Sequence, residues 1–218
     1  MGCSGGYSVK TVFPQVGGIG VVGCTPSGIC VGPYINPGES IGITGSMPLP
    51  FCFSPDTKMT ILENNQEYKK NVTEIKIGDF VQTFNGKEKI YTKIIENTKN
   101  EGVFEFYEIK VKDENLNIKK ITVTGNHTMI VFGNDKEIKF KFACELKIGD
   151  LLRTNNGLFE VYEINHEMKY DSYKLLSEKG TILANDILVS TIYLEGKSNV
   201  KECNKLIDSI KIPIEIKN

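Results

Sequence analysis

The stretch "IKIGDFVQT", residues 75–83, recurs in the chain as "LKIGDLLRT", residues 146–154. Each copy has an apolar residue, Lys, Ile, Gly, Asp and an apolar residue in the same order, with a Thr at the same distance. Each copy also follows a polar stretch and precedes a strand–turn–strand pattern. Chance reuse of a common strand–turn signature is the alternative. An internal repeat predicts two related structural units, here two similar β lobes joined in one fold.

The chain from Cys52 onward alternates apolar and polar residues in short runs, which is typical of β-strands. Turn signals such as Asn85-Gly86 and Asn155-Asn156-Gly157 separate these runs. We therefore predict an all-β fold. The predicted strand regions are 75–84, 105–113, 119–132, 137–142, 146–154, 158–164 and 181–191.

Changes of composition divide the chain into three parts. Residues 1–51 are rich in Gly, Pro, Ser and Val and carry few charges, which predicts a Gly-rich loop or loose β segment. Residues 52–194 form the predicted β domain. Residues 195–218 form a tail, in which apolar residues at helical spacing predict a short amphipathic helix over 198–211.

Composition excludes several classes of function. Lys and Arg number 26 against 27 acidic residues, so no strong field would attract nucleic acid. The six cysteines include no pair with the spacing of a zinc site, and we expect neither a metal nor another cofactor. No apolar run reaches the roughly 18 residues of a membrane-spanning helix, and the N-terminus lacks the order of a signal peptide. The compartment is not readable from the sequence.

Cys52 is the first residue of the charged region, in "LPFCFSPDTKMTILENNQ". A thiol at this position can attack the carbonyl of the preceding residue, Phe51, because the nucleophile and the scissile bond are covalently adjacent. The alternative is a small hydrophobic core residue, the usual role of a free cysteine.

His127 is one of two histidines and lies in "TVTGNHTM", three residues after Thr124. An imidazole that titrates near neutrality can protonate a departing backbone nitrogen, and a Thr hydroxyl can hold that nitrogen. The alternative for His127 is a structural histidine. His166 is flanked by charges and is expected in a solvated loop.

These motifs occur in the order "CFSPDTKMTILENNQ", "IKIGD", "TVTGNH" and "GTILANDILVS". In this order, residues 52–191 resemble the Hint family, which comprises inteins, bacterial intein-like domains and the autoprocessing domain of Hedgehog proteins. Cys52-Phe53 is similar to the opening Cys-Phe of the family, and Thr124 to His127 is similar to its T-x-x-H motif. The closing strand, 180–190, resembles the Hedgehog form more than that of a splicing intein.

The resemblance implies the Hint fold and autocatalytic cleavage of the Phe51–Cys52 bond. Cys52 would attack the Phe51 carbonyl, His127 would protonate the Cys52 nitrogen, and Thr124 would bind that amide, so that a thioester replaces the peptide bond. The substrate is the chain's own N-terminal segment. Water or a small nucleophile would then resolve the thioester.

The closing segment departs from both relatives. A splicing intein has His and a cyclising Asn where this chain has Ser190 and Thr191, so full splicing is not expected. Thr191 also stands where Hedgehog proteins have Cys, and the tail is short for a sterol-recognition region, so we do not expect sterol transfer. Glu96 and Glu101 lie in the stretch where the Hedgehog acidic base is expected. Phe51 occupies a position where Gly is common in Hedgehog proteins, and its bulk would slow cleavage.

Three other functions compete with autocleavage. An inactive Hint module would hold Cys52 as a packing residue and leave the chain whole. A cysteine hydrolase using Cys52 and His127 would act on an external substrate. A metal-binding module is disfavoured by the spacing of Cys and His.

Overall fold

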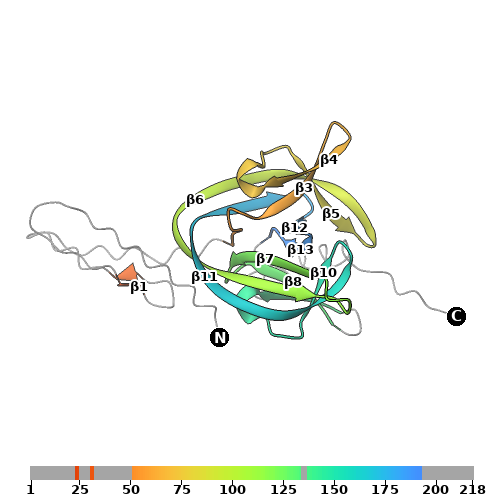
Figure 1. The fold of residues 1–218 in the computed structure, drawn as a ribbon. Coiled ribbons are helices and arrows are strands. Elements are labelled where there is room, and N and C mark those ends of the chain that lie inside the picture. The colour runs from red at the N-terminus through yellow and green to blue at the C-terminus, as the bar shows by residue number, and fades with distance from the viewer. Residues whose placement is uncertain (1–22, 25–29, 32–50, 134–136, 193–218) are drawn as a thin grey trace, which may run out of the picture.

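The computed structural model describes residues 23–24, 30–31, 51–133 and 137–192. The described part is all-β, as predicted, and its only helices are two single 3-10 turns, η1 (Val72–Glu74) and η2 (Ala143–Glu145) (Figure 1). No helix in these ranges is long and apolar enough to cross a membrane. The amphipathic helix predicted over 198–211 lies outside the described residues.

Two sheets are present in the described ranges. The strands β1 (Gly23–Cys24) and β2 (Cys30–Val31) form a separate antiparallel pair. The other eleven strands form one sheet, with the order β10-β11-β6-β5-β3-β12-β13-β8-β9, in which β4 is added to β3 and β7 to β6. Further pairings of β10 with β13 and with β8 close this sheet upon itself. These strands are β3 (Lys58–Glu63), β4 (Gln66–Asn71), β5 (Phe80–Asn85), β6 (Glu88–Lys112), β7 (Ile118–Thr124), β8 (Thr128–Phe132), β9 (Ile138–Phe142), β10 (Leu151–Thr154), β11 (Gly157–Ser177), β12 (Thr181–Ala184) and β13 (Ile187–Ser190).

The long strands β6 and β11 form a curved antiparallel ribbon that extends along the whole domain (Figure 1). One end of β6 pairs with β5 and the other with β7, so the ribbon joins the two halves covalently. The pairing has three irregularities, between Val161 and Glu163, between Tyr170 and Ser172, and between Leu176 and Ser177. Bulges of this kind bend a strand, which agrees with the curvature.

The two copies of the repeated sequence adopt the same turn. Gly78 has φ +100° and Gly149 has φ +94°, a conformation that favours glycine over residues with a Cβ. The Gly78 N–H donates to the Ile94 carbonyl at 2.8 Å, and the Gly149 N–H donates to the Val161 carbonyl at 2.9 Å. Each turn is thereby attached to the long ribbon, once on β6 and once on β11.

The aspartate after each glycine closes its turn. The Asp79 carboxylate accepts from the Lys76 N–H at 2.9 Å, and the Asp150 carboxylate accepts from the Lys147 N–H at 2.9 Å. These side chains satisfy backbone donors at the entry of a strand, where no ladder partner is available. The two copies therefore share the same order of residues because both form the same turn.

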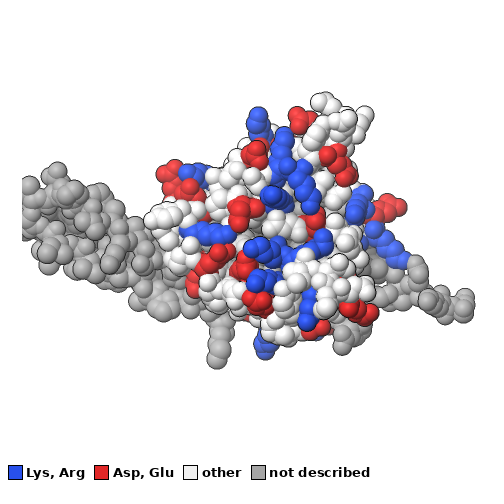
Figure 2. Space-filling model, viewed as in Figure 1, with Lys and Arg blue, Asp and Glu red and all other residues white. Residues whose placement is uncertain are grey.

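The apolar residues of the alternating runs form one main core and one smaller cluster. Phe53, next to Cys52, is fully buried in the main core. The remaining large and fully buried side chains of this core are Met59, Ile61, Ile94, Ile109, Ile121, Met129, Leu152, Phe159 and Leu175. On the face drawn in Figure 2, Lys and Arg are interleaved with Asp and Glu, in keeping with the near-zero net charge.

We predict that Asp150→Ala destabilises the domain more than Asp79→Ala. Both variants lose one charged acceptor of a backbone N–H, which costs about 1 kcal/mol. Asp150 also binds Lys141 Nζ through both carboxylate oxygens, at 2.7 and 2.8 Å, where both side chains are mostly buried. We expect a further loss of about 1 kcal/mol for Asp150→Ala. Urea unfolding in a Cys52→Ala background measures both, and Lys141→Met should reproduce only the additional loss. Equal losses for the two aspartates would contradict this assignment.

Candidate active site

The residues around Cys52 complete the hydrogen bonding between strands β7 and β11. The Phe53 N–H donates to the Tyr173 carbonyl at 2.8 Å, and the Tyr173 N–H donates back at 2.9 Å. On the other side, the Ser54 N–H donates to the Thr122 carbonyl at 3.1 Å. Backbone hydrogen bonds to β11 on one side and to β7 on the other therefore fix the position of the chain at Cys52, which does not lie in a free loop.

Thr124 holds the backbone of Cys52 at two points. The Cys52 N–H donates to the Thr124 hydroxyl at 2.8 Å, and the Thr124 N–H donates to the Cys52 carbonyl at 3.0 Å. Both residues are buried. The nitrogen of the Phe51–Cys52 peptide bond is thus bound to the side chain that the T-x-x-H motif places there.

The Cys52 thiol is fully buried and is surrounded by polar groups of the β6–β11 ribbon. Asn100 Nδ2 donates to Sγ at 3.4 Å, and Ser172 forms a further hydrogen bond with the thiol. Asn100 and Ser172 are paired across the ribbon, with Nδ2 and the hydroxyl 3.5 Å apart. Burial raises the pKa of the Cys52 thiol to about 12, although Ser172, Asn100 and Lys174 oppose the shift. Cys52 is therefore a neutral thiol at pH 7.

The T-x-x-H motif forms a turn between β7 and β8, and not the continuous strand that the sequence predicts over 119–132. The His127 N–H donates to the Thr124 carbonyl at 2.9 Å. The turn η2 fixes this loop, because the Ala143 N–H donates to the His127 carbonyl and the Cys144 N–H donates to the Gly125 carbonyl, each at 2.9 Å. The second copy of the repeat, which begins after η2, is thus linked directly to the candidate site.

The His127 ring is fully buried among aromatic side chains. It meets the Phe53 ring edge-on, with centroids 4.6 Å apart, and the Phe51 ring at 6.4 Å. Burial lowers the pKa of His127 to about 3, and a nearby backbone group of Ser190 opposes this shift only in part. Neither ring nitrogen has a hydrogen bond of normal geometry within the described residues. Burial therefore disfavours the protonated ring at pH 7, in contrast to the expectation that His127 titrates near neutrality.

The two candidate acids differ in position. Glu96 lies close enough to Cys52 to raise the pKa of its thiol, and it pairs with Lys174 at 2.9 Å. The hydrogen bond from Lys174 lowers the pKa of Glu96, so this carboxylate is ionised. Glu101 has 81% of its side chain exposed and pairs with Lys99 at 3.2 Å. Of the two, Glu96 is the one that the fold brings to the thiol.

The hydroxyls of the closing segment are bound within the fold. Ser190 exchanges hydrogen bonds with the backbone of Ile192, at 2.9 and 3.0 Å, and its own backbone lies near the His127 ring. The Thr191 hydroxyl accepts from the Ser177 N–H at 3.1 Å. The closing strand therefore ends beside the His127 side of the site.

Sequence reasoning missed Asn100, Ser172 and Lys174. Each is a polar residue within a long strand, and no motif distinguishes it from the polar residues around it. Their common position follows from the register of β6 against β11, which a single sequence does not reveal. His166, expected in a loop, instead lies within β11 opposite Tyr107.

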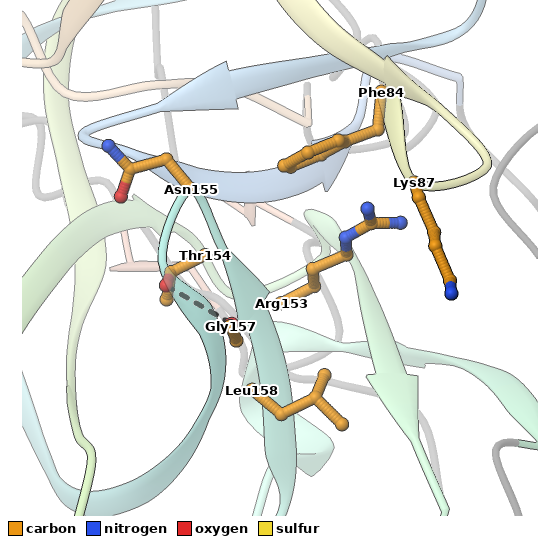
Figure 3. A pocket seen from close by; sticks show the side chains of 7 residues that line it. All are labelled: Phe84, Lys87, Arg153, Thr154, Asn155, Gly157 and Leu158. Atoms are coloured by element: carbon orange, nitrogen blue, oxygen red, sulfur yellow. Dashed lines mark hydrogen bonds between the residues drawn. The ribbon is translucent and has the colours of Figure 1, made fainter. Parts of the chain in front are cut away.

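A separate cavity of about 280 Å³ lies between the β5–β6 and β10–β11 turns (Figure 3). The Arg153 guanidinium stacks over the Phe84 ring there, 3.7 Å from its centroid. None of the residues that contact the Cys52 thiol lines this cavity. Within the described ranges, no cluster of His, Cys, Asp and Glu has the arrangement of a metal site.

The arrangement of Cys52, Thr124 and His127 on this closed β-sheet is accompanied by a match of residues 45–198 to the Hint module. This chain belongs to the Hint family. Solved structures with a similar fold include an intein from a hyperthermophile, with 16% sequence identity and a TM-score of 0.56 over 64% of this chain and 99% of the intein.

Two further structures bear the same likeness. The transcription factor IIB Mvu mini-intein is 16% identical, with a TM-score of 0.53 over 64% of this chain and 99% of its own. A bacterial intein-like domain from Clostridium thermocellum is 22% identical, with a TM-score of 0.50 over 64% of this chain and 97% of its own. At such identities the likeness establishes the Hint/intein fold alone. No curated protein sequence matches this chain.

We predict that the His127 ring stays neutral from pH 7.5 down to at least pH 5, because burial holds its pKa near 3. Nitrogen NMR of the Cys52→Ala protein measures this directly. The unfolded chain protonates His127 near pH 6.5, so the folded state should lose stability as the pH falls from about 6.5 towards 3.

A His127→Phe variant in the same background provides the control for this pH dependence. Its free energy of unfolding should fall less steeply over that range than that of the Cys52→Ala parent. A His127 ring that titrates at its ordinary pKa would show that the ring is hydrated in solution.

Proposed function

We propose that this domain cleaves its own Phe51–Cys52 peptide bond by an N-to-S acyl shift. The observation that supports this most is the 2.8 Å hydrogen bond from the Cys52 N–H to the Thr124 hydroxyl, because it holds the nitrogen that must leave. Cys52 Sγ would attack the Phe51 carbonyl carbon and form a carbon–sulfur bond. The carbon–nitrogen bond would break, and the proton lost by the thiol would end on the Cys52 amine.

The thiol and its proton must move together in this step. With the pKa of Cys52 near 12, forming a free thiolate at pH 7 costs roughly 7 kcal/mol. That is a large part of the barrier of a slow single-turnover reaction. Transfer of the proton during attack avoids the isolated buried anion.

We assign the proton transfer to the neutral His127 ring. A neutral imidazole has one nitrogen that accepts a proton and one that donates, so the ring can receive the thiol proton and supply one to the departing nitrogen. The ring packs on Phe51 and Phe53, the residues on either side of Cys52. Glu96 is the second candidate acceptor, and its ion pair with Lys174 makes it a weaker base.

Water or a small nucleophile would then release the segment 1–51. The C-terminal flank would stay attached, because Thr191 has no side-chain amide that could cyclise as Asn does. The Hedgehog-like character of the closing strand and the absence of sterol transfer remain expectations of the sequence. Cleavage at Cys52 would separate the proposed segment 1–51 from the proposed Hint domain 52–194, to which the proposed tail 195–218 would stay attached.

An inactive Hint module is the competing function, and the full burial of Cys52 in the described core agrees with a packing role. A hydrolase acting on external substrates fits less well. An external carbonyl would have to reach a thiol of zero exposure, whereas the Phe51 carbonyl is already attached to the residue that carries it.

Intact mass spectrometry of the full chain and of Cys52→Ala, each with and without neutral hydroxylamine, tests cleavage. Hydroxylamine is preferable to a thiol reagent here, because Cys144 is disulfide-bonded and a thiol would also reduce that bond. We expect the native chain alone to yield a 1–51 hydroxamate and a fragment that begins with Cys52. Breakage at Asn85-Gly86 or Asn156-Gly157 would give other masses and would occur in both proteins. If neither protein is cut at Cys52 and digestion yields no peptide that begins with Cys52, the domain is an inactive module.

We predict that Thr124→Val slows formation of this hydroxamate by about 100-fold, because it removes a positioned hydroxyl from the leaving nitrogen while keeping the side chain's shape. Thr128→Val is the matched control. Its hydroxyl is equally buried, lies next to His127 in sequence, and has no hydrogen-bond partner among the described residues. Rates from quenched time courses compare the two, and equal slowing would show a general packing defect.

A further inference from the structure

Lys174 brings a primary amine to the acyl group that cleavage would activate. Its Nζ lies 5.8 Å from the centre of the Phe51 ring, and its positive charge lowers the pKa of the Cys52 thiol, against the larger effect of burial. Phe51 is the residue whose carbonyl would carry the thioester. The amine thus lies near the Phe51 side chain and within electrostatic range of the Cys52 thiol.

The strand register explains why Lys174 faces the site. Lys174 is two residues beyond Ser172 on β11, so both side chains lie on the same face of the ribbon. Across the ribbon, Ser172 pairs with Asn100 and Lys174 pairs with Thr98. The hydrogen bond between Asn100 and the Cys52 thiol shows that this face is the one that covers Cys52.

Glu96 supplies the acceptor that an amine nucleophile needs. Its two carboxylate oxygens bind Lys174 Nζ at 2.9 and 3.1 Å. An ammonium group has no free electron pair, so Lys174 must lose a proton before it can attack. A carboxylate already hydrogen-bonded to that ammonium is placed to receive it.

We propose that Lys174 Nζ attacks the Phe51–Cys52 thioester and joins the segment 1–51 to the Lys174 side chain through an isopeptide bond. This inference rests on the proposed acyl shift. Glu96 takes the proton from the ammonium, a bond forms between Nζ and the Phe51 carbonyl carbon, and the carbon–sulfur bond breaks. The nitrogen loses a second proton as the amide forms, and Sγ receives that proton, so that the Cys52 thiol is restored. No oxidant or further reactant is required.

The structure favours Lys174 over bulk water as the resolving nucleophile. The thiol is fully buried, and Phe51 is half-buried between the rings and strands around it, so water reaches the thioester poorly. A tethered amine needs no diffusional encounter with the thioester, which favours it over water. The product has the same mass as the precursor but has a free amine at Cys52, which makes the reaction invisible to intact mass alone.

The test compares the native chain with Lys174→Arg, which keeps the positive charge but lacks the amine. Lys110→Arg is the matched control, because Lys110 lies on the same ribbon in an ion pair with Glu163 at 2.8 Å. Each protein is incubated without added nucleophile and digested. Tandem mass spectrometry then searches for Phe51 bonded to Lys174 and for peptides that begin with Cys52, while free 1–51 acid is quantified.

We expect the native chain and Lys110→Arg to give the Phe51–Lys174 bond with little free acid. Lys174→Arg should give free 1–51 acid, raised about tenfold or more over the native chain, and no cross-link. Glu96→Gln should slow the cross-link more than it slows release by hydroxylamine, which reports the acyl shift alone. Release of free acid by the native chain without a cross-link, or a cross-link at another lysine, would overturn the inference and leave the acyl shift standing. If hydroxylamine cuts no variant at Cys52, both fail together.

Discussion

The backbone pairing of residues 52–54 between β7 and β11 is the constraint on which the candidate site depends. Cys52 and Phe53 act as a short strand segment whose donors and acceptors are used by Thr124 and Tyr173. A residue held in this way cannot swing into a cleft, so its neighbours must be built around it. Accordingly, Thr124 comes from β7, Asn100 from β6 and Ser172 from β11, each from a strand that this segment contacts directly or through the ribbon. The strand order of the sheet therefore decides which side chains surround Cys52.

The same burial that fixes Cys52 also keeps the reacting groups uncharged. Burial raises the pKa of the thiol to about 12 and lowers the pKa of His127 to about 3. The two shifts have opposite signs because each disfavours a charge in the core. Because the thiol and the imidazole are both neutral, neither is an unpaired buried ion, whose cost is high. The ion pair of Lys174 with Glu96, which acts on the thiol, is partly solvated, where the cost of its charges is lower.

The sequence predicts the parts of this structure that rest on local chemistry. The repeated Gly-Asp turn requires a positive φ at Gly78 and Gly149, and the T-x-x-H motif requires a loop short enough to return to the Cys52 amide. The extent of β6 and β11 is different. Their middle sections are rich in Lys, Glu, Asn and Thr, so alternation predicts only 105–113 and 158–164, and polar strand residues look the same as a solvated loop. Asn100 and Ser172 lie in just this part, which is why their contact with the thiol is visible only once the strands are paired.

A bulge in the ribbon decides which of these polar side chains reach Cys52. Glu101 and Gly102 of β6 stand opposite the single residue Asp171 of β11, which has φ +63°. An offset of one residue exchanges the two faces of a strand, so the bulge sets the face for every pair beyond it. With it, Asn100 and Ser172 share the face that covers the thiol. The residues that follow at alternate positions, Lys174 on one strand and Glu96 on the other, lie on that face as well. Glu101, at the bulge itself, is left exposed. One inserted residue thus separates the acid that reaches the site from the acid that does not, although both lie in the same short stretch of sequence.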